Sequence, residues 1–207
     1  VGAQARSTWS TALGNQSRAN ETKGVGGTAI GTTAKAEDNY ATAVGLGAEA
    51  KAGYSTALGM NAKATQRDSV ALGDYSVDRA ATKETKGTIT LSDGTIREYG
   101  NFAGSNPIGV VSVGAKDKER QIINVAAGKI SADSTDAVNG SQLYSLAGEV
   151  GKNTEAIAKN TEAIAKNTQD ISNIKSDITQ LTTEAGKHTT VTAGMNENLT
   201  VIEGTNN

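Results

Sequence analysis

The strongest pattern of apolar positions lies between Leu143 and Leu181, where large aliphatic residues recur at intervals of three and four at both ends and of seven in the middle. One set is spaced by seven residues and consists of Ile157, Ile164, Ile171 and Ile178. This heptad spacing predicts a coiled coil with the isoleucines at position a and with Ile174 and Leu181 at position d. Because one such helix leaves its apolar seam uncovered, we expect the chain to form an oligomer.

The residues at positions a and d favour three helices rather than two. β-branched isoleucine at a with Ile or Leu at d favours three or more strands. Three consecutive d positions carry Asn153, Asn160 and Asn167. A buried asparagine can fix the register at a cost in stability, and a ring of amide donors can hold an anion or water on the axis. The pattern is compatible with both roles.

A second repeat, with a period of 14 residues, occupies the N-terminal part of the chain. The sequence Thr-Ala-aliphatic-Gly begins at Thr28, Thr42 and Thr56, with Val70 in place of the fourth threonine, and an offset copy begins at Thr11. Alternating alanines form a second short run in each copy. Two short strands in every 14 residues predict the coils of a β-solenoid. We expect the alanines to fill a narrow interior together with one aliphatic residue from each copy, namely Ile30, Val44, Leu58 and Leu72.

Residues 80–110 interrupt the 14-residue period. Two alternating runs between Gly87 and Tyr99 flank the sequence Ser-Asp-Gly and predict a β-hairpin with its turn at Asp93 and Gly94. Further strands are expected at 110–113 and 120–125. We interpret the hairpin as an insertion in the segment that connects the solenoid to the helix. The alternative is that it is a dedicated binding loop.

The helix is expected to begin near Ser134, a residue suited to the N-cap, with Asp136 opposing the helix dipole in the first turn. Gly140 weakens this start, so a boundary six residues later is the alternative. We expect the helix to end near Gly186, and the Thr- and Val-rich run from 188 to 202 to open a further β domain. The predicted parts are a head at 1–79, an insertion at 80–110, a neck at 111–133, a stalk at 134–185 and a β domain at 186–207.

Composition supports an extended, repetitive molecule. Among the 207 residues, 24 are glycine, none is cysteine and 3 % are aromatic, which is too few large apolar side chains for a compact core of this size. The net charge of −2 gives no indication of nucleic-acid binding. Apolar runs are too short to span a bilayer. The sequence shows no signal peptide, and because Val1 falls inside a repeat, we expect it to be an excised part of a longer protein.

The sequence contains no motif that indicates catalysis. Its one histidine, His188, lies beyond the expected helix end, and with no cysteine a conventional zinc site lacks ligands. We therefore expect no enzyme activity, no cofactor and no metal site. A group of charged residues at the end of the head is expected to form a solvated or inter-chain ion-pair region, and consists of Asp78, Arg79, Lys83, Glu84 and Lys86.

These elements resemble the trimeric autotransporter adhesins of Gram-negative bacteria, the group typified by the Yersinia adhesin. The 14-residue repeats are similar to the head of that family. Residues 111–144 are similar to its neck, and the run NTEAIAKNTEAIAKNT to its stalk. The neck sequence in front of a stalk that carries asparagines is the most specific part of the resemblance.

The resemblance implies a homotrimer with a left-handed parallel β-roll head, a neck and a parallel three-stranded coiled-coil stalk. It further implies chloride on the stalk axis at Asn153, Asn160 and Asn167, and display on the bacterial surface through an outer-membrane anchor that this sequence lacks. The implied function is attachment to host extracellular matrix or cell-surface proteins through the head. A purely structural fibre or spacer is the alternative, and the sequence names neither the host ligand nor the residues that bind it.

Overall fold

The structure is a computed structural model that describes residues 2–20 and 24–189. It separates into two units, one that ends at Asn139 and one that begins at Gly140. Among the described residues, the strands all lie in the first unit and the second unit is one helix. None of the helical residues that the structure describes forms a segment apolar and long enough to span a membrane.

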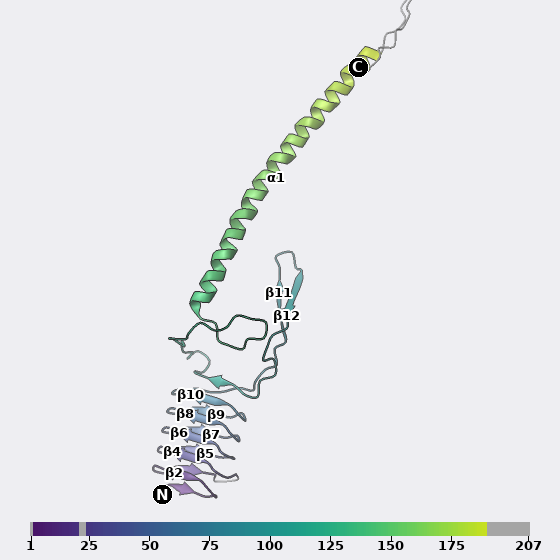
Figure 1. Ribbon diagram of the computed structural model, residues 1–207. Coiled ribbons are helices and arrows are strands. Elements are labelled where there is room, and N and C mark those ends of the chain that lie inside the picture. The colour runs from purple at the N-terminus through teal and green to yellow at the C-terminus, as the bar shows by residue number, and fades with distance from the viewer. Residues whose placement is uncertain (1, 21–23, 190–207) are drawn as a thin grey trace, which may run out of the picture. The chain divides into compact units, whose positions relative to one another are not determined.

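A β-solenoid built from two parallel sheets occupies the N-terminal unit, and Figure 1 shows its coils stacked one on the next. The five-stranded sheet has the order β1 (Gln4–Ala5), β3 (Arg18–Ala19), β5 (Lys35–Ala36), β7 (Glu49–Ala50) and β9 (Lys63–Ala64). The six-stranded sheet contains, in spatial order from its C-terminal end, β13 (Val111–Ser112), β10 (Val70–Leu72), β8 (Thr56–Leu58), β6 (Thr42–Val44), β4 (Thr28–Ile30) and β2 (Thr11–Leu13). The predicted solenoid and its 14-residue coil are confirmed.

Equivalent residues of successive copies pair across the coils. Thr42 pairs with Thr56, and Val44 with Leu58. The offset first copy also pairs in register, with Thr11 opposite Thr28. The longer spacing between these two copies therefore leaves the register of their strands unchanged.

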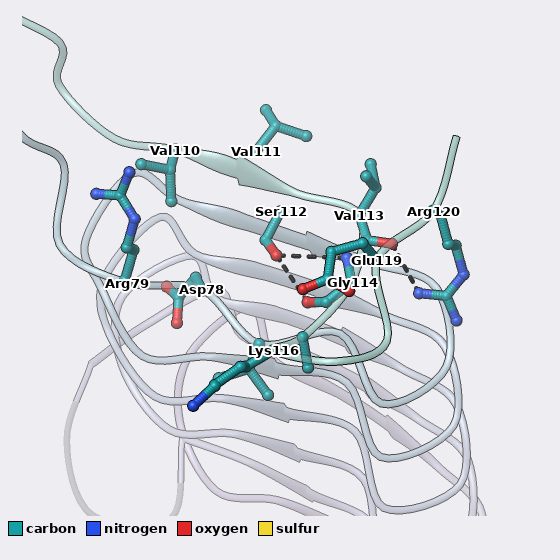
Figure 2. Close-up of a pocket in the computed structure, with 12 residues that line it drawn as sticks. Asp78, Arg79, Val110, Val111, Ser112, Val113, Gly114, Lys116, Glu119 and Arg120 are labelled. Atoms are coloured by element: carbon teal, nitrogen blue, oxygen red, sulfur yellow. Dashed lines mark hydrogen bonds between the residues drawn. The ribbon is translucent and has the colours of Figure 1, made fainter. Parts of the chain in front are cut away.

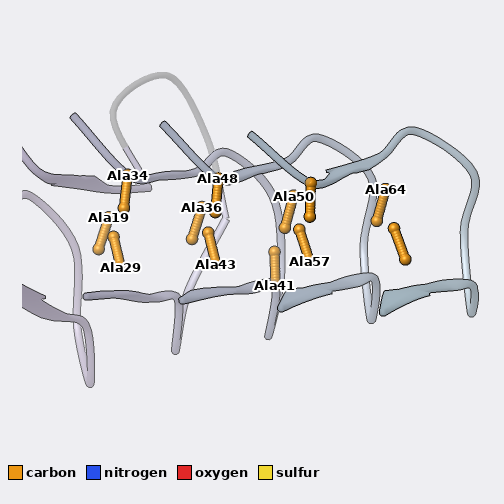
Figure 3. Close-up of a cluster of buried hydrophobic side chains, with 12 residues drawn as sticks. Ala19, Ala29, Ala34, Ala36, Ala41, Ala43, Ala48, Ala50, Ala57 and Ala64 are labelled. Atoms are coloured by element: carbon orange, nitrogen blue, oxygen red, sulfur yellow. The ribbon is translucent and has the colours of Figure 1, made fainter. Parts of the chain in front are cut away.

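Alanine alone forms the hydrophobic interior of the solenoid, as Figure 3 shows. In the part of the chain that the structure describes, the fully buried hydrophobic residues are Ala19, Ala29, Ala34, Ala36, Ala41, Ala43, Ala48, Ala50, Ala57, Ala62, Ala64 and Ala71. The prediction that one aliphatic residue per coil points inward was wrong. In the three-residue strands β4, β6, β8 and β10 the middle alanine is buried, so its two neighbours face outward on the pleat. Leu58 and Leu72 are accordingly 43 % and 42 % exposed.

The hairpin predicted in the insertion is confirmed. Strands β11 (Lys86–Thr90) and β12 (Ile96–Gly100) are antiparallel, with Thr90 opposite Ile96. Gly94 has a φ of 83° in the turn, and the amide of Thr95 donates to the Asp93 carboxylate at 2.9 Å. This backbone hydrogen bond lowers the pKa of Asp93.

After the insertion the chain returns to the solenoid and adds one more strand. The strand expected at 110–113 is present as β13, whose Val111 pairs in parallel with Val70. The prediction of a strand at 120–125 was wrong, because the described residues there form no strand. Arg120 at its start turns its side chain toward the last coil instead.

The helix α1 (Gly140–Thr189) is 50 residues long and begins six residues after the start expected at Ser134. Ser134 does not cap it, because its hydroxyl accepts from the amide of Asp136 in a local turn. The Asp136 carboxylate accepts from the Lys129 amide and so lies outside the first helical turn. Gly140, considered as the alternative boundary, is the first helical residue.

At its other end the helix runs three residues past the end expected at Gly186. His188 thus lies within the helix and not beyond it. Of the further β domain predicted at 186–207, the residues up to Thr189 are helical, and the remainder lies outside the described residues.

Candidate functional site

The outer face of the six-stranded sheet is apolar and uncovered. On each strand from β4 to β8 the outward positions hold a threonine and an aliphatic residue, and in-register pairing aligns both kinds into ranks along the coils. Leu13 is 64 % exposed. A continuous rank of aliphatic side chains in water indicates a surface made for contact with another protein.

The outer face of the five-stranded sheet carries charges. Glu49 sits at the centre with only 15 % of its side chain exposed, and its carboxylate oxygens lie 3.0 Å from the Nζ atoms of Lys35 and Lys51 and 3.9 Å from that of Lys63. Burial acts to raise the pKa of Glu49, but the hydrogen bonds and charges of Lys35 and Lys51 outweigh it, so that the pKa is lowered. The hydrogen bond to Glu49 raises the pKa of Lys51.

One corner of the solenoid carries a short aromatic stack. The rings of Tyr40 and Tyr54 stack with centroids 5.4 Å apart and an interplanar angle of 29°. The guanidinium of Arg67 lies 4.5 Å from the Tyr54 centroid, in a cation–π contact. At the other end Tyr40 leans over Gly26, where an added Cβ would lie 2.7 Å from the ring. Both outer ring faces are therefore covered, and the stack reinforces the corner.

A hollow of about 660 Å³ opens where the last coil meets the neck (Figure 2). Its lining combines four valines with five charged residues. Asp78, expected in an ion-pair region, instead accepts hydrogen bonds from the amide and hydroxyl of Thr65 and from the amide of Gln66. Arg79 donates to the carbonyl of Ala80, and Lys86 pairs with Glu98 on the hairpin. The charged residues at the head's end thus bind to separate parts of the structure.

The helix presents an uncovered apolar seam. Ile157 and Ile164 are each 64 % exposed, and Ile171 is 66 % exposed. The threonines that follow the asparagines bond within the helix, because Thr154, Thr161 and Thr168 each donate to the carbonyl four residues earlier. In this single chain the helix places Asn153, Asn160 and Asn167 at regular seven-residue steps in exposed positions. Their proposed rings of amides require the other chains.

Within residues 2–20 and 24–189, no group of three or more His, Cys, Asp and Glu side chains is arranged to hold a metal ion. Sequence reasoning missed several side-chain arrangements in this part of the chain. The ion pairs of Glu49 with Lys35 and Lys63 had a signal in the 14-residue spacing of these residues. The stack of Tyr40 and Tyr54 could have been predicted, because residues 14 apart occupy equivalent positions in neighbouring coils. The contacts of Arg120 with the last coil had no such signal, because they join segments 44 and 46 residues apart.

Two family models match the chain. The coiled stalk of trimeric autotransporter adhesin matches residues 121–187. The YadA head domain repeat matches twice, at residues 23–48 and 50–76. The two head matches fall on the coils from β4 to β10, and the stalk match covers the neck from Gln121 and most of the helix.

Solved structures and curated relatives are similar to parts of this chain. The C-terminal YadA-like domain of BPSL2063 from Burkholderia pseudomallei is 42 % identical with a TM-score of 0.49, over 55 % of this chain and 52 % of that one. The collagen-binding domain of the Yersinia adhesin YadA is 24 % identical with a TM-score of 0.35, over 66 % and 73 %.

Autotransporter adhesin BtaE of Brucella suis biovar 1 (strain 1330) is 52 % identical over 67 residues, which are 32 % of this chain and 9 % of the relative. Autotransporter adhesin EhaG of Escherichia coli O157:H7 is 51 % identical over 59 residues, which are 28 % of this chain and 4 % of the relative. The chain thus spans less than a tenth of the curated relatives that it matches. With head repeats followed by a stalk, the chain belongs to the YadA-like trimeric autotransporter adhesins.

Proposed function

We propose that this chain is part of a bacterial surface adhesin whose head, residues 1–79, attaches to host extracellular matrix or cell-surface proteins. The observation that carries the proposal is the in-register stack of coils, which repeats the same outward groups along the head. Several copies of a weak site on one rigid body bind with avidity. Family membership points to an adhesive, non-enzymatic role. In this proposal the whole protein is displayed at the bacterial cell surface and anchored in the outer membrane, as its autotransporter relatives suggest.

The adhesin is a homotrimer in this proposal, with a left-handed β-roll head, a neck and a parallel coiled-coil stalk. Two uncovered apolar surfaces support it, namely the aliphatic rank of the six-stranded sheet and the seam of α1. Sedimentation equilibrium should give about three times the chain mass of 21.1 kDa. A monomer or dimer across micromolar concentrations would contradict this assembly.

The adhesion test compares two deletions of the same chain. Residues 28–69 make three whole coils, and removing them rejoins the remaining strands in register, since Thr28, Thr42, Thr56 and Val70 are equivalent positions. We expect this deletion to keep the trimer and to weaken binding to immobilised collagen, fibronectin or laminin. Deleting residues 157–170, two whole heptads of the stalk, is the matched control and should leave binding unchanged. If the head deletion binds as well as the parent, the binding site lies in the 80–110 insertion and not in the coils. If the parent chain itself does not bind, the result favours a structural spacer.

The stalk asparagines bind an anion on the trimer axis in this proposal. Three amides at each level of Asn153, Asn160 and Asn167 supply three N–H donors, and an unpaired buried amide costs about 1–3 kcal/mol. The apolar a layers on either side restrict water. Replacing all three by isoleucine should raise Tm and remove any axial halide signal from bromide-soaked crystals. If the crystals show no density on the axis, or if only water occupies it after the bromide soak, the anion proposal fails. The asparagines would then serve only to set the register of the helices.

A further inference from the structure

Successive coils of the solenoid are joined at their glycine corner by a regular pair of backbone hydrogen bonds. The amides of Gly45, Gly59 and Gly73 each donate to a carbonyl oxygen of the preceding coil, at 2.7–2.8 Å. Two residues further on, the amides of Asn61 and Tyr75 do the same at 2.8 Å. Each coil therefore depends on the next one to satisfy two of its carbonyl groups.

At the last coil the two equivalent carbonyl groups belong to Leu72 and Asp74, and side chains satisfy them. The Leu72 carbonyl accepts from the Ser76 hydroxyl at 2.7 Å, and the Asp74 carbonyl accepts from Nη2 of Arg120 at 2.8 Å. The other terminal nitrogen of Arg120, Nη1, donates to the Ser76 hydroxyl at 3.1 Å and to the Val113 carbonyl at 2.7 Å. Figure 2 shows this guanidinium beside the neck segment.

The position of the guanidinium reproduces that of a missing coil. A Cβ added to Gly31 would lie 2.5 Å from the carbonyl oxygen of Gly45, and one added to Gly59 would lie 2.5 Å from the carbonyl carbon of Gly73. A Cβ added to Gly73 would meet Arg120 instead, at 3.1 Å from Cζ and 3.2 Å from Nη1. Arg120 therefore stands over Gly73 where the backbone of a following glycine stands over each earlier one.

We infer that Arg120 is the end cap of the solenoid: its guanidinium replaces the peptide groups that a complete next coil would supply at the glycine corner, and it fastens the neck to the last coil. A planar group with several N–H donors can imitate a peptide in this way, whereas the ammonium of lysine offers no flat surface or fixed fork. The same guanidinium binds Asp74 on the head side and Val113 on the neck side, so one side chain holds the two segments in a fixed register. This role does not depend on which ligand the head binds.

The cap has a consequence for the edge of the six-stranded sheet. The strand β13 is only two residues long, and beyond it an open corner of the last coil would leave carbonyl groups free to pair with another chain. Arg120 and Ser76 occupy those groups at the corner. The stack thus ends where the neck begins.

Hydrogen–deuterium exchange on the whole chain tests the cap. The reporters are the amides of Val70 and Val77, which donate to the neck carbonyls of Val110 and Gly114. In Arg120→Ala we expect these two amides to exchange about tenfold faster or more, since a hydrogen bond from a charged donor is worth about one such factor. Arg120→Lys should fall closer to the alanine variant than to the parent.

Arg79→Ala is the matched control, because it removes from the same hollow a guanidinium whose hydrogen bond among the described residues is to the neighbouring carbonyl of Ala80. Its exchange should equal that of the parent. The coil from Thr42 to Val44 should keep its protection in every variant. Should Arg120→Ala fail to fold, the conservative Arg120→Lys still carries the test. Parental exchange at Val70 and Val77 in the Arg120 variants, or an equal loss of protection in all coils, would overturn the cap.

Discussion

The solenoid and the helix both expose apolar side chains, yet they differ in what a single chain can bury. Each coil of the solenoid packs alanines against its neighbours and bonds its backbone to them, so it has an interior of its own. The helix satisfies its backbone but leaves its seam open, with Ile174 and Leu181 57 % and 65 % exposed. We therefore expect the stalk to depend on association with other chains far more than the head does.

The largest expected effect separates the two parts by breaking the stalk alone. Ile164→Ser removes an a-position side chain from each chain of the trimer and should destabilise the stalk by about 2–5 kcal/mol per chain. Thermal unfolding followed by circular dichroism at 222 nm should show an earlier helical transition. Lys166→Ser, on the outer face of the helix, is the control and should change it by only a few tenths of a kcal/mol. Equal melting of both variants would mean that position 164 lies outside the interface.

A second substitution should break the head and spare the stalk. Gly59 has a φ of 133°, and an added Cβ would lie 2.5 Å from backbone of the next coil. Gly59→Ala should therefore cost at least about 2 kcal/mol. Gly148→Ala is the control, because nothing lies within 4 Å of its added Cβ, and it should stabilise the helix by about 0.5–1 kcal/mol. Denaturant unfolding of both variants measures the difference, and a harmless Gly59→Ala would contradict the close stacking of the coils.

A third substitution should have a smaller effect and measures how far the stability of the head depends on its association with other chains. Leu58→Lys places a charge in the aliphatic rank and should weaken head association by roughly 1–2 kcal/mol, since a half-exposed leucine loses part of its burial. The alanine interior of each chain should survive. Hydrogen exchange should accordingly show protected coils in a head that dissociates more readily. Lys63→Leu, on the other sheet, should leave association unchanged. Coils that unfold in Leu58→Lys would show that the head has no independent interior.

The smallest effect concerns acid. The lowered pKa of Glu49 means that its ion pairs stabilise the head fully above the ordinary glutamate value of 4.5 and are lost as the pH falls through the lowered value. Glu49→Gln should remove up to about 1 kcal/mol at neutral pH and flatten this acid dependence. Melting curves of the head between pH 3 and 7 provide the measurement. Glu155→Gln on the helix is the control and should not change how the melting temperature of the head depends on pH. If Glu49→Gln shows the same pH dependence as the parent, the ion pairs of Glu49 are not the cause of that dependence.

The periodic parts of this chain were predictable because the same pattern of small, aliphatic and glycine residues recurs in each repeat. The 14-residue spacing gave the coils and their strands, and the Asp93-Gly94 turn gave the hairpin. The prediction that the aliphatic residues point inward failed because large aliphatic residues are usually core residues. The two closely spaced sheets here enclose only small side chains, alanine and serine. Ile30 and Val44 therefore lie on the outside.

Boundaries and single contacts were harder to predict. Ser134 and Asp136 have the chemistry of a helix start but are used in local turns before Gly140. Arg120 looked like part of a strand, because neighbouring Ile122 and Ile123 favour one. Its real partners are carbonyl and hydroxyl groups far away in the sequence, which no local pattern marks. The asparagine layers of the stalk stay a prediction.

The return of the chain to the solenoid after the insertion has a consequence for how such molecules can vary. Ser69 and Val110 bond to each other across 41 residues of sequence, whereas neighbouring coils are 14 residues apart. Val111 nevertheless pairs with Val70 as Val70 pairs with Thr56. The corner is thus a splice point at which segments of different length can be exchanged without disturbing the stack, and new surface loops can be sampled while the scaffold keeps its register.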